Sequence, residues 1–253
     1  MKPINTSRLC QTAAALLTAF LALCAASTSY AANAGAKVAV VSLGLFGGQN
    51  VFEREAKGAA DIVAKQFGGD PVVVRFNTKS RHEVTVESVA ATLQSAPAGM
   101  DPEQDILWVI LTSHGSKAGL VVQAGKRVDT LSPSTLAAML NRTGVRHRVV
   151  IISACYSGIF IPPLADAETL VITAADANHP SFGCRDGAQW TYFGDALFNN
   201  ALRRMANLKN AFALARKIVG ARERANGFAP SNPQMAGGRN VEPLLVPRAA
   251  ALH

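Results

Sequence analysis

Long apolar runs, metal-ligand clusters and nucleotide-binding fingerprints are scarce or missing in this 253-residue chain. After residue 31 no apolar run is long enough to span a membrane, so we expect no stable membrane insertion of the processed protein. The histidines His82, His147 and His179 stand in unrelated segments, and no His, Cys, Asp or Glu cluster has convincing metal-ligand spacing. The glycine-rich stretch 44–48 lacks the G-x-G-x-x-G spacing, which argues against nucleotide binding. Internal repeats are also missing.

The first 31 residues have the three-part pattern of a secretory signal. Lys2 and Arg8 give a positive start, and residues 12–26 form an uncharged, almost wholly apolar stretch. Small residues at positions 29 and 31 provide a cleavage site after Ala31. The apolar stretch is shorter than the roughly 20 residues of a spanning helix, so a cleaved signal is favoured over an uncleaved anchor. We therefore expect a signal peptide at 1–31 and a protein exported to the periplasm or secreted.

The processed chain is moderately basic but carries no recognisable nucleic-acid motif. Cleavage would leave 222 residues and remove two of 25 basic residues and none of 17 acidic ones, which gives a net charge of +6. The basic residues are scattered, and solvated helix or loop faces account for them as well as a binding patch does. We expect no nucleic-acid partner.

Strand-like and helix-like segments alternate along the chain. Val- and Ile-rich runs predict buried strands at 37–43, 71–76, 106–111, 147–153 and 170–174. Helical spacing and caps predict helices at 51–67, 84–93, 133–141, 191–205 and 208–224. A small hairpin is expected around 120–128 and a short edge strand at 234–235. This alternation is typical of a mostly parallel sheet covered by helices on both faces, in one domain at 32–240. The tail 241–253 is expected to be disordered.

Reactive side chains follow the carboxyl ends of two predicted strands; we call these positions strand exits. The apolar run 106–111 leads into Thr112-Ser113-His114-Gly115, and the run ending at Ile152 leads into Ser153-Ala154-Cys155. In parallel sheets the functional groups lie beyond the carboxyl ends of the strands. An imidazole beside a thiol yields a thiolate nucleophile and can then protonate the leaving amine. The amides of Gly115 and Cys155 are candidate oxyanion donors.

Each of these residues also has an ordinary structural interpretation. A histidine after a strand is commonly a turn residue, and a cysteine at a strand end is commonly a small core residue. Cys155 and Cys184 are the two cysteines left after processing, and two cysteines in an exported chain invite a disulfide. The alternatives at this stage are a catalytic thiol, a Cys155–Cys184 bridge and two buried thiols.

Three stretches resemble the legumain (C13) family of cysteine peptidases, which shares a caspase-like fold with caspases. The segment 112–122 resembles the family's His-Gly-Ser segment and the hairpin that follows it, and 153–158 resembles its Ala-Cys-x-Ser-Gly motif. The segments 173–184 and 191–195 resemble a third block, in which a Ser-Ser-Tyr-Ala-Cys stretch precedes Tyr-Leu-Gly-Asp. The resemblance implies an α/β fold, a caspase-like three-layer sandwich around a mostly parallel sheet of about six strands.

The resemblance also implies roles for individual residues. His114 becomes the general acid and base, Cys155 the nucleophile and Gly115 an oxyanion donor. Ser181 and Asp195 match residues that line the pocket for the side chain before the cleaved bond. Legumains favour asparagine there, and aspartate under acidic conditions. The expected function is hydrolysis of peptides or proteins by a cysteine endopeptidase without a cofactor or metal.

Several positions depart from the family pattern. Legumains usually have a glutamate of the pocket two residues before the nucleophile. This chain has Ser153 there, and by its position Ser153 is the corresponding candidate for substrate binding. An asparagine that assists the histidine would correspond to Asn50, and a pocket arginine to Arg54. The sequence does not separate a peptidase from a transamidase or ligase of the same fold, because both share the acyl-enzyme. A non-catalytic binding module with the same fold is a further alternative.

Overall fold

The structure is a computed structural model, and it describes residues 36–205 and 207–247. The signal peptide predicted at 1–31 lies outside these residues.

A six-stranded sheet forms the centre of the domain. Its order is β2 (Gly69–Phe76), β1 (Val38–Gly44), β3 (Ile106–Thr112), β7 (His147–Ser153), β8 (Thr169–Thr173) and β9 (Gln234–Gly237). The first five strands are parallel, and the edge strand β9 pairs antiparallel with β8. The predicted mostly parallel sheet is therefore confirmed.

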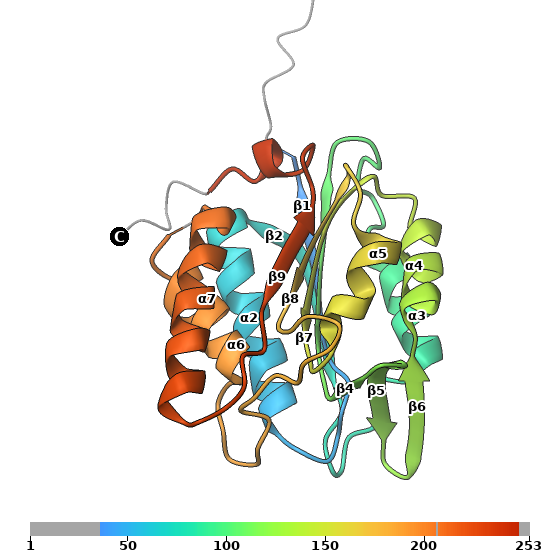
Figure 1. Cartoon of the computed structure of the whole chain (residues 1–253). Coiled ribbons are helices and arrows are strands. Elements are labelled where there is room, and N and C mark those ends of the chain that lie inside the picture. Colours follow the sequence, from blue (N-terminus) through green and yellow to red (C-terminus); the bar gives the residue numbers. More distant parts are fainter. Residues whose placement is uncertain (1–35, 206, 248–253) are drawn as a thin grey trace, which may run out of the picture. The chain divides into compact units, whose positions relative to one another are not determined.

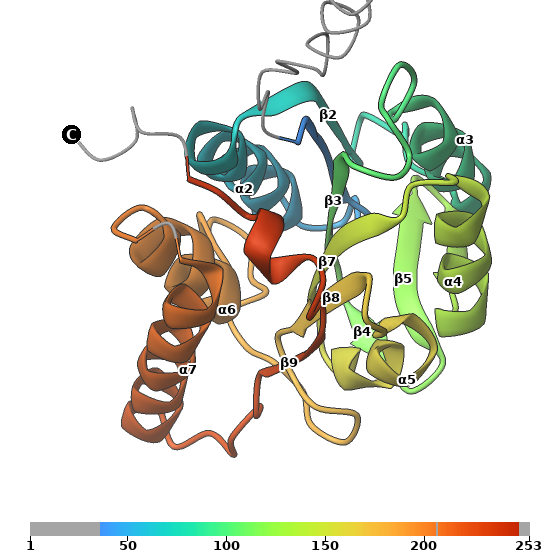
Figure 2. The ribbon, with the colours of Figure 1, turned by 90° about the horizontal axis from the view of Figure 1, so that it is seen from above.

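Helices cover both faces of this sheet (Figures 1 and 2). One face carries α2 (Val51–Phe67), α6 (Tyr192–Gly194), the π-helix η3 (Asp195–Leu202) and α7 (Leu208–Ala225). The other carries α3 (Val86–Ser95), α4 (Pro133–Arg142), the short 3-10 helix η2 (Ser157–Phe160) and α5 (Ile161–Leu164). Successive strand residues such as Val40 and Val41 are fully buried in opposite layers. That is why the strands appear in the sequence as unbroken apolar runs, and the predicted three-layer sandwich is confirmed.

Local signals explain most element boundaries. The Ser132 hydroxyl accepts a hydrogen bond from the Thr135 amide and caps α4, and α2 ends at Gly68 with a φ of 82°. The helix expected at 191–205 is instead one α-helical turn followed by the π-helix η3. Helical periodicity alone does not distinguish these two windings over so short a segment.

A second, three-stranded sheet lies beside the exit of β3 and contains β4 (Gly115–Ser116), β5 (Gly119–Ala124) and β6 (Arg127–Leu131). It holds the loop that follows β1. The Gly47 amide donates to the Gln123 carbonyl at 3.1 Å, and the Gln123 amide donates to the Leu45 carbonyl at 2.9 Å. The loop 45–50 is thereby fixed next to the exit of β3.

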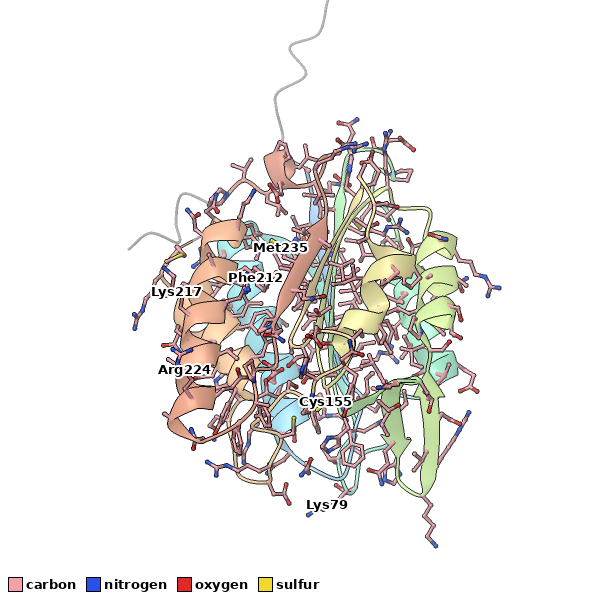
Figure 3. All side chains as sticks on the ribbon, viewed as in Figure 1. Lys79, Cys155, Phe212, Lys217, Arg224 and Met235 are labelled. Atoms are coloured by element: carbon pink, nitrogen blue, oxygen red, sulfur yellow. The ribbon has the colours of Figure 1, made fainter. Side chains whose placement is uncertain are left out.

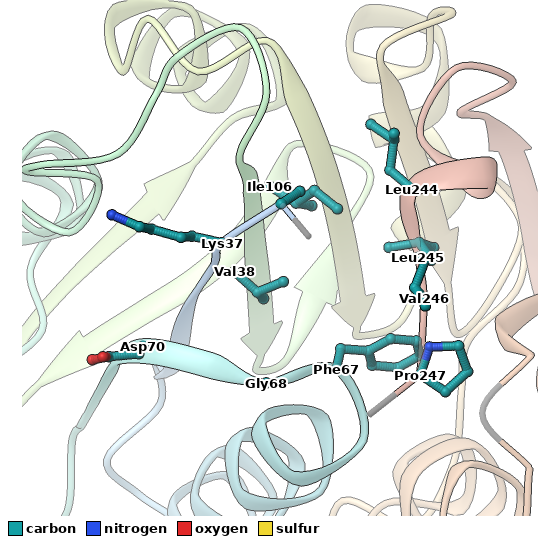
Figure 4. Close-up of a pocket in the computed structure, with 11 residues that line it drawn as sticks. Lys37, Val38, Phe67, Gly68, Asp70, Ile106, Leu244, Leu245, Val246 and Pro247 are labelled. Atoms are coloured by element: carbon teal, nitrogen blue, oxygen red, sulfur yellow. The ribbon is translucent and has the colours of Figure 1, made fainter. Parts of the chain in front are cut away.

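A pocket of about 420 Å³ lies at the opposite end of the strands (Figure 4). It is lined at the start of β1 and β3 by Val38 and Ile106 and on its other side by Leu244 and Leu245. The nearby Val241 is fully buried, and a 3-10 helix, η4 (Glu242–Leu244), follows it. The packed domain therefore continues beyond residue 240, where the sequence suggested a disordered tail.

Candidate active site

The register of β3 and β7 brings the two reactive side chains to the same edge of the sheet. Thr112 and Ser153 are the last paired residues of these neighbouring strands. His114 and Cys155 each lie two residues beyond that pair, at the carboxyl ends of the central strands where Figure 3 labels Cys155. The register of the sheet thus places His114 and Cys155 at equivalent positions just beyond the carboxyl ends of two neighbouring strands.

Gly115 allows the two exits to approach closely. A Cβ atom built on Gly115 would collide with the carbonyl oxygen of Cys155 and would lie 3.2 Å from the Ala154 Cβ. Any other residue at this position would push the exits apart. The glycine that follows the histidine is therefore required by the contact between the two exits.

The His114 ring is held between two phenylalanines and one amide. Its centroid lies 4.6 Å from that of Phe46 and 5.0 Å from that of Phe52, both in edge-to-face geometry. Its Nε2 atom lies 2.7 Å from the Oε1 atom of Gln49. This burial lowers the pKa of His114 below its ordinary value, which favours the neutral imidazole that can accept a proton.

The Gln49 amide also defines the tautomer of that imidazole. The Gln49 side-chain nitrogen donates to the Cys184 carbonyl at 3.2 Å, and a carbonyl can only accept. Oε1 is therefore the atom that faces His114, and the ring Nε2 must carry the hydrogen. The remaining Nδ1 atom of neutral His114 is then the one with a free lone pair.

Cys155 lies in a sharp turn and is half-buried. The following Tyr156 has a φ of 56°, which is unusual for a residue with a side chain. The Cys155 sulfur lies 3.3 Å from both the amide nitrogen and the carbonyl oxygen of Ser181. Ser181 belongs to the connection between β8 and α6, residues 174–191, which we call the β8–α6 loop.

Two amides are available near the sulfur. The backbone carbonyl of His114 accepts a hydrogen bond from the Val121 amide. The next residue, Gly115, therefore occupies a non-hydrogen-bonded position of the β4–β5 pair. The Gly115 amide therefore points away from β5. Within residues 36–205 and 207–247, the Cys155 amide is not engaged by any hydrogen bond. Both predicted oxyanion donors are thus free of partners in the described part of the chain.

A profile of the peptidase C13 family matches residues 78–239, which is more than half of the chain. The chain belongs to the peptidase C13 family. The match covers both strand exits and the β8–α6 loop, and it confirms the resemblance to the legumain family. Comparison with curated proteins gave no match.

The fold of this C13 family member is similar to that of caspase-1 from Spodoptera frugiperda. The TM-score is 0.56 at 15% sequence identity, over 80% of this chain and 86% of the caspase chain. At this identity the similarity concerns the fold, and it confirms the predicted caspase-like architecture. Family membership shows a relationship to cysteine peptidases, whereas the roles of individual residues remain predictions.

Ser153 and Ser181, both predicted to bind substrate, lie in different environments. Ser153 is buried, and its hydroxyl lies 3.1 Å from that of Thr191. Ser181 is half-buried and contacts the Cys155 sulfur. Of these two residues of the C13 chain, Ser181 is the one that the structure places against the proposed nucleophile.

Asp195, the third predicted pocket residue, is already engaged by two donors. Its Oδ1 atom accepts from the Asn199 side chain at 2.8 Å, and its Oδ2 atom lies 3.2 Å from a guanidinium nitrogen of Arg222. The Arg222 guanidinium also lies over the Tyr192 ring at 4.5 Å from the centroid. The charge of the Asp195 carboxylate is therefore offset by a neighbouring cation.

Arg54, the fourth predicted pocket residue, anchors the β8–α6 loop. Its guanidinium donates to the carbonyls of Gly187 and Ala188 at 3.0 and 3.2 Å. The start of α2 thus holds the far end of the loop whose Ser181 touches the sulfur.

Cys184 lies in the same loop and has a free thiol, as does Cys155. Burial raises the pKa of the Cys184 thiol above its ordinary value, and the nearby Cys155 and Glu55 raise it further. The Cys184 thiol is therefore protonated at neutral pH. Both cysteines are half-buried free thiols, so the structure contains no Cys155–Cys184 bridge.

The sequence analysis missed two residues of the site. Gln49, not Asn50, contacts His114; the Asn50 side chain instead accepts a hydrogen bond from the Gly187 amide. The assignment of Asn50 was wrong because the loop after β1 offers no pattern that fixes its alignment. Glu55 was also missed, although an acidic residue on the buried face of a predicted helix was a usable signal.

Within the described residues, no group of three or more His, Cys, Asp or Glu side chains could hold a metal ion. The helices of the described ranges are likewise too short or too polar to cross a membrane.

Proposed function

We propose that this chain is a cysteine endopeptidase that hydrolyses peptide bonds through His114 and Cys155. The observation that carries the proposal is the contact between the two strand exits. The matched register of β3 and β7, which puts His114 and Cys155 each two residues beyond the last pair, and the close approach of Gly115 to the Cys155 backbone support this pairing. Membership of the peptidase C13 family supports the same chemistry.

The proposed reaction proceeds through an acyl-enzyme. The Nδ1 atom of His114 takes the thiol proton of Cys155, and the thiolate adds to the carbonyl carbon of the scissile bond. The amides of Gly115 and Cys155 donate to the resulting oxyanion. The C–N bond then breaks, and His114 gives its proton to the leaving amine. Water, deprotonated by His114, adds to the thioester and releases the acid and the thiol.

The side chain before the cleaved bond is proposed to be asparagine or aspartate. The family resemblance supports this preference, and Ser181 lies at the sulfur where that side chain would enter. The pairing of Asp195 with Arg222 reduces the repulsion that an isolated carboxylate would exert on an aspartate. A peptide-library cleavage profile of the protein and of Asp195→Asn tests this preference.

The protein is proposed to act outside the cytoplasm, in the periplasm or as a secreted enzyme. The support is the three-part pattern of residues 1–31 in the sequence. Amino-terminal sequencing of the protein recovered from the extracytoplasmic fraction tests it, and a start near residue 32 is the expected result.

Labelling with a thiol-directed probe that carries an asparagine residue tests the nucleophile. The intact protein and Cys184→Ala should be labelled and should cleave peptides, whereas Cys155→Ala should do neither, because removal of a nucleophile costs at least about 1,000-fold in rate. Equal labelling of the protein and Cys155→Ala would contradict the assignment. Products formed in the presence of added amines would separate hydrolysis from transamidation.

A further inference from the structure

Glu55 is a fully buried carboxyl group directly beneath the two strand exits. One of its oxygens accepts a hydrogen bond from the Thr112 hydroxyl at 2.9 Å, and the other accepts from the Thr191 amide at 2.8 Å. The Ser153 hydroxyl lies 3.1 Å from the Thr191 hydroxyl and lowers the pKa of the carboxyl, which brings the end of β7 into the same network. Thr112 and Ser153 are the last paired residues of β3 and β7, and Thr191 caps α6. One side chain therefore links three separate segments.

Glu55 lies on the same face of α2 as Phe52, a residue that packs against His114. Phe52 and Glu55 are three residues apart on the helix and so lie on one face. Phe52 packs against the His114 ring, and Glu55 reaches the base of the strand exits. On the opposite side Gly194 provides the room, because a Cβ atom there would collide with the Glu55 carboxyl. The carboxyl is enclosed by α2, β3, β7 and α6.

Burial raises the pKa of Glu55 above its ordinary value, although hydrogen bonds from Ser153, Thr191 and Thr112 oppose the rise. Glu55 and Cys155 each contribute to the raised pKa of the Cys184 thiol, so Cys184 lies near both groups. A neutral Glu55 carboxyl adds no negative charge beneath the two strand exits. A neutral carboxyl can also be replaced by an amide of the same shape.

We propose that Glu55 is a positioning residue of the reaction, which fixes the exits of β3 and β7 and the start of α6 relative to one another. The inference rests on the proposed peptidase function. Glu55 does not touch substrate, since it is fully buried. It acts on Thr112 and Ser153, each two residues before a member of the catalytic pair.

Two substitutions at Glu55 separate the hydrogen bonds from the filled volume. Glu55→Leu fills the space without polar atoms and should lower kcat by about 100-fold with little change in KM, because small displacements of reacting groups have effects of this size. Glu55→Gln keeps an acceptor for the Thr191 amide and a donor for the hydroxyls, and should stay within about threefold of the unmodified protein. Glu53→Gln, at a half-buried neighbour on the same helix that is paired with Lys57, is the matched control and should change nothing.

Thr112→Val tests the same bond from the other partner and does not alter the helix. Valine keeps the shape of threonine without its hydroxyl, and kcat should fall by about tenfold. A folded Glu55→Leu with unchanged kcat would overturn the inference. Equal losses in Glu55→Leu and Glu55→Gln, or a fully active Thr112→Val, would also overturn it.

Alkylation of Cys155 by iodoacetamide provides a readout that needs no peptide substrate. The rate is followed by mass spectrometry of the Cys155 peptide from about pH 5 to about pH 9, because the thiolate is the reactive form. Glu55→Leu should react more slowly near neutral pH than Glu55→Gln. If the unmodified protein cleaves no peptide, the proposed function fails while this comparison still decides the inference. An identical rate profile for both variants would defeat the positioning role alone.

Discussion

The strand exits and the β8–α6 loop both surround Cys155, yet they are held in different ways. The exits of β3 and β7 continue a seven-residue parallel ladder, so backbone pairing sets their positions. The β8–α6 loop lies between strand and helix, and the side chains of Gln49, Asn50 and Arg54 in a distant segment hold it. The proposed catalytic pair therefore depends on sheet register, whereas the loop proposed to line the pocket depends on long-range contacts.

Gly115→Ala would disturb the exits of β3 and β7, and it should have the largest effect on the rate of peptide cleavage. The added Cβ would collide with the Cys155 carbonyl, so the exits must separate and the Gly115 amide must move. We expect peptide cleavage to fall by about 100-fold or more, as for loss of an oxyanion donor. Initial rates of peptide cleavage measure it. Gly220→Ala in α7, where the nearest atom is 3.3 Å away at the end of a flexible arginine, should leave the rate unchanged.

Arg54→Ala would loosen the β8–α6 loop, the second of the two regions compared. Loss of the two hydrogen bonds to Gly187 and Ala188 frees the loop end but leaves the strand ladder intact. We expect KM to rise by about tenfold and kcat to change less, because each lost bond to a charged group is worth about 1.5–3 kcal/mol at most. Steady-state kinetics measure both constants. A larger loss in kcat than in KM would show that the loop also positions Cys155, and Lys57→Ala on the same helix is the control.

The pH dependence of stability should show the smallest effect. Burial lowers the pKa of His114 in the folded state below its ordinary value of 6.5, which applies to the unfolded state. The folded protein therefore binds a proton at His114 less readily than the unfolded protein does. The associated stability is present above pH 6.5 and is lost as the pH falls through the lower folded value. The melting temperature should therefore fall by about 2 °C more in the unmodified protein than in His114→Gln between neutral and acidic pH. The exposed His82→Gln should behave like the unmodified protein.

The sequence predicted the fold and the centre of the site because their signals are local. Buried parallel strands appear as continuous apolar runs, and the exits follow from where those runs stop. The helix 51–67 was predicted with the bounds that α2 has, from its apolar spacing and terminal glycines. His114, Gly115 and Cys155 lie within three residues of strand ends, where such reasoning is strongest.

The surroundings of the site were less predictable, because they depend on contacts between distant segments. Gln49 and His114 are 65 residues apart, and Glu55 and Thr191 are 136 apart. Contacts between residues so far apart along the chain leave no periodic pattern in a single sequence. The ion pair between Asp195 and Arg222 likewise requires α7 to be placed before it can be seen.

The borders of the central sheet limit how copies of the chain can associate. On one side β9 has only four residues, and on the other β2 carries Pro71, which lacks an amide hydrogen, between Asp70 and the charged Arg75. Short, proline-containing or charged border strands are poor templates for adding another chain. Both border strands of the sheet therefore disfavour fibre-like stacking of further copies of the chain.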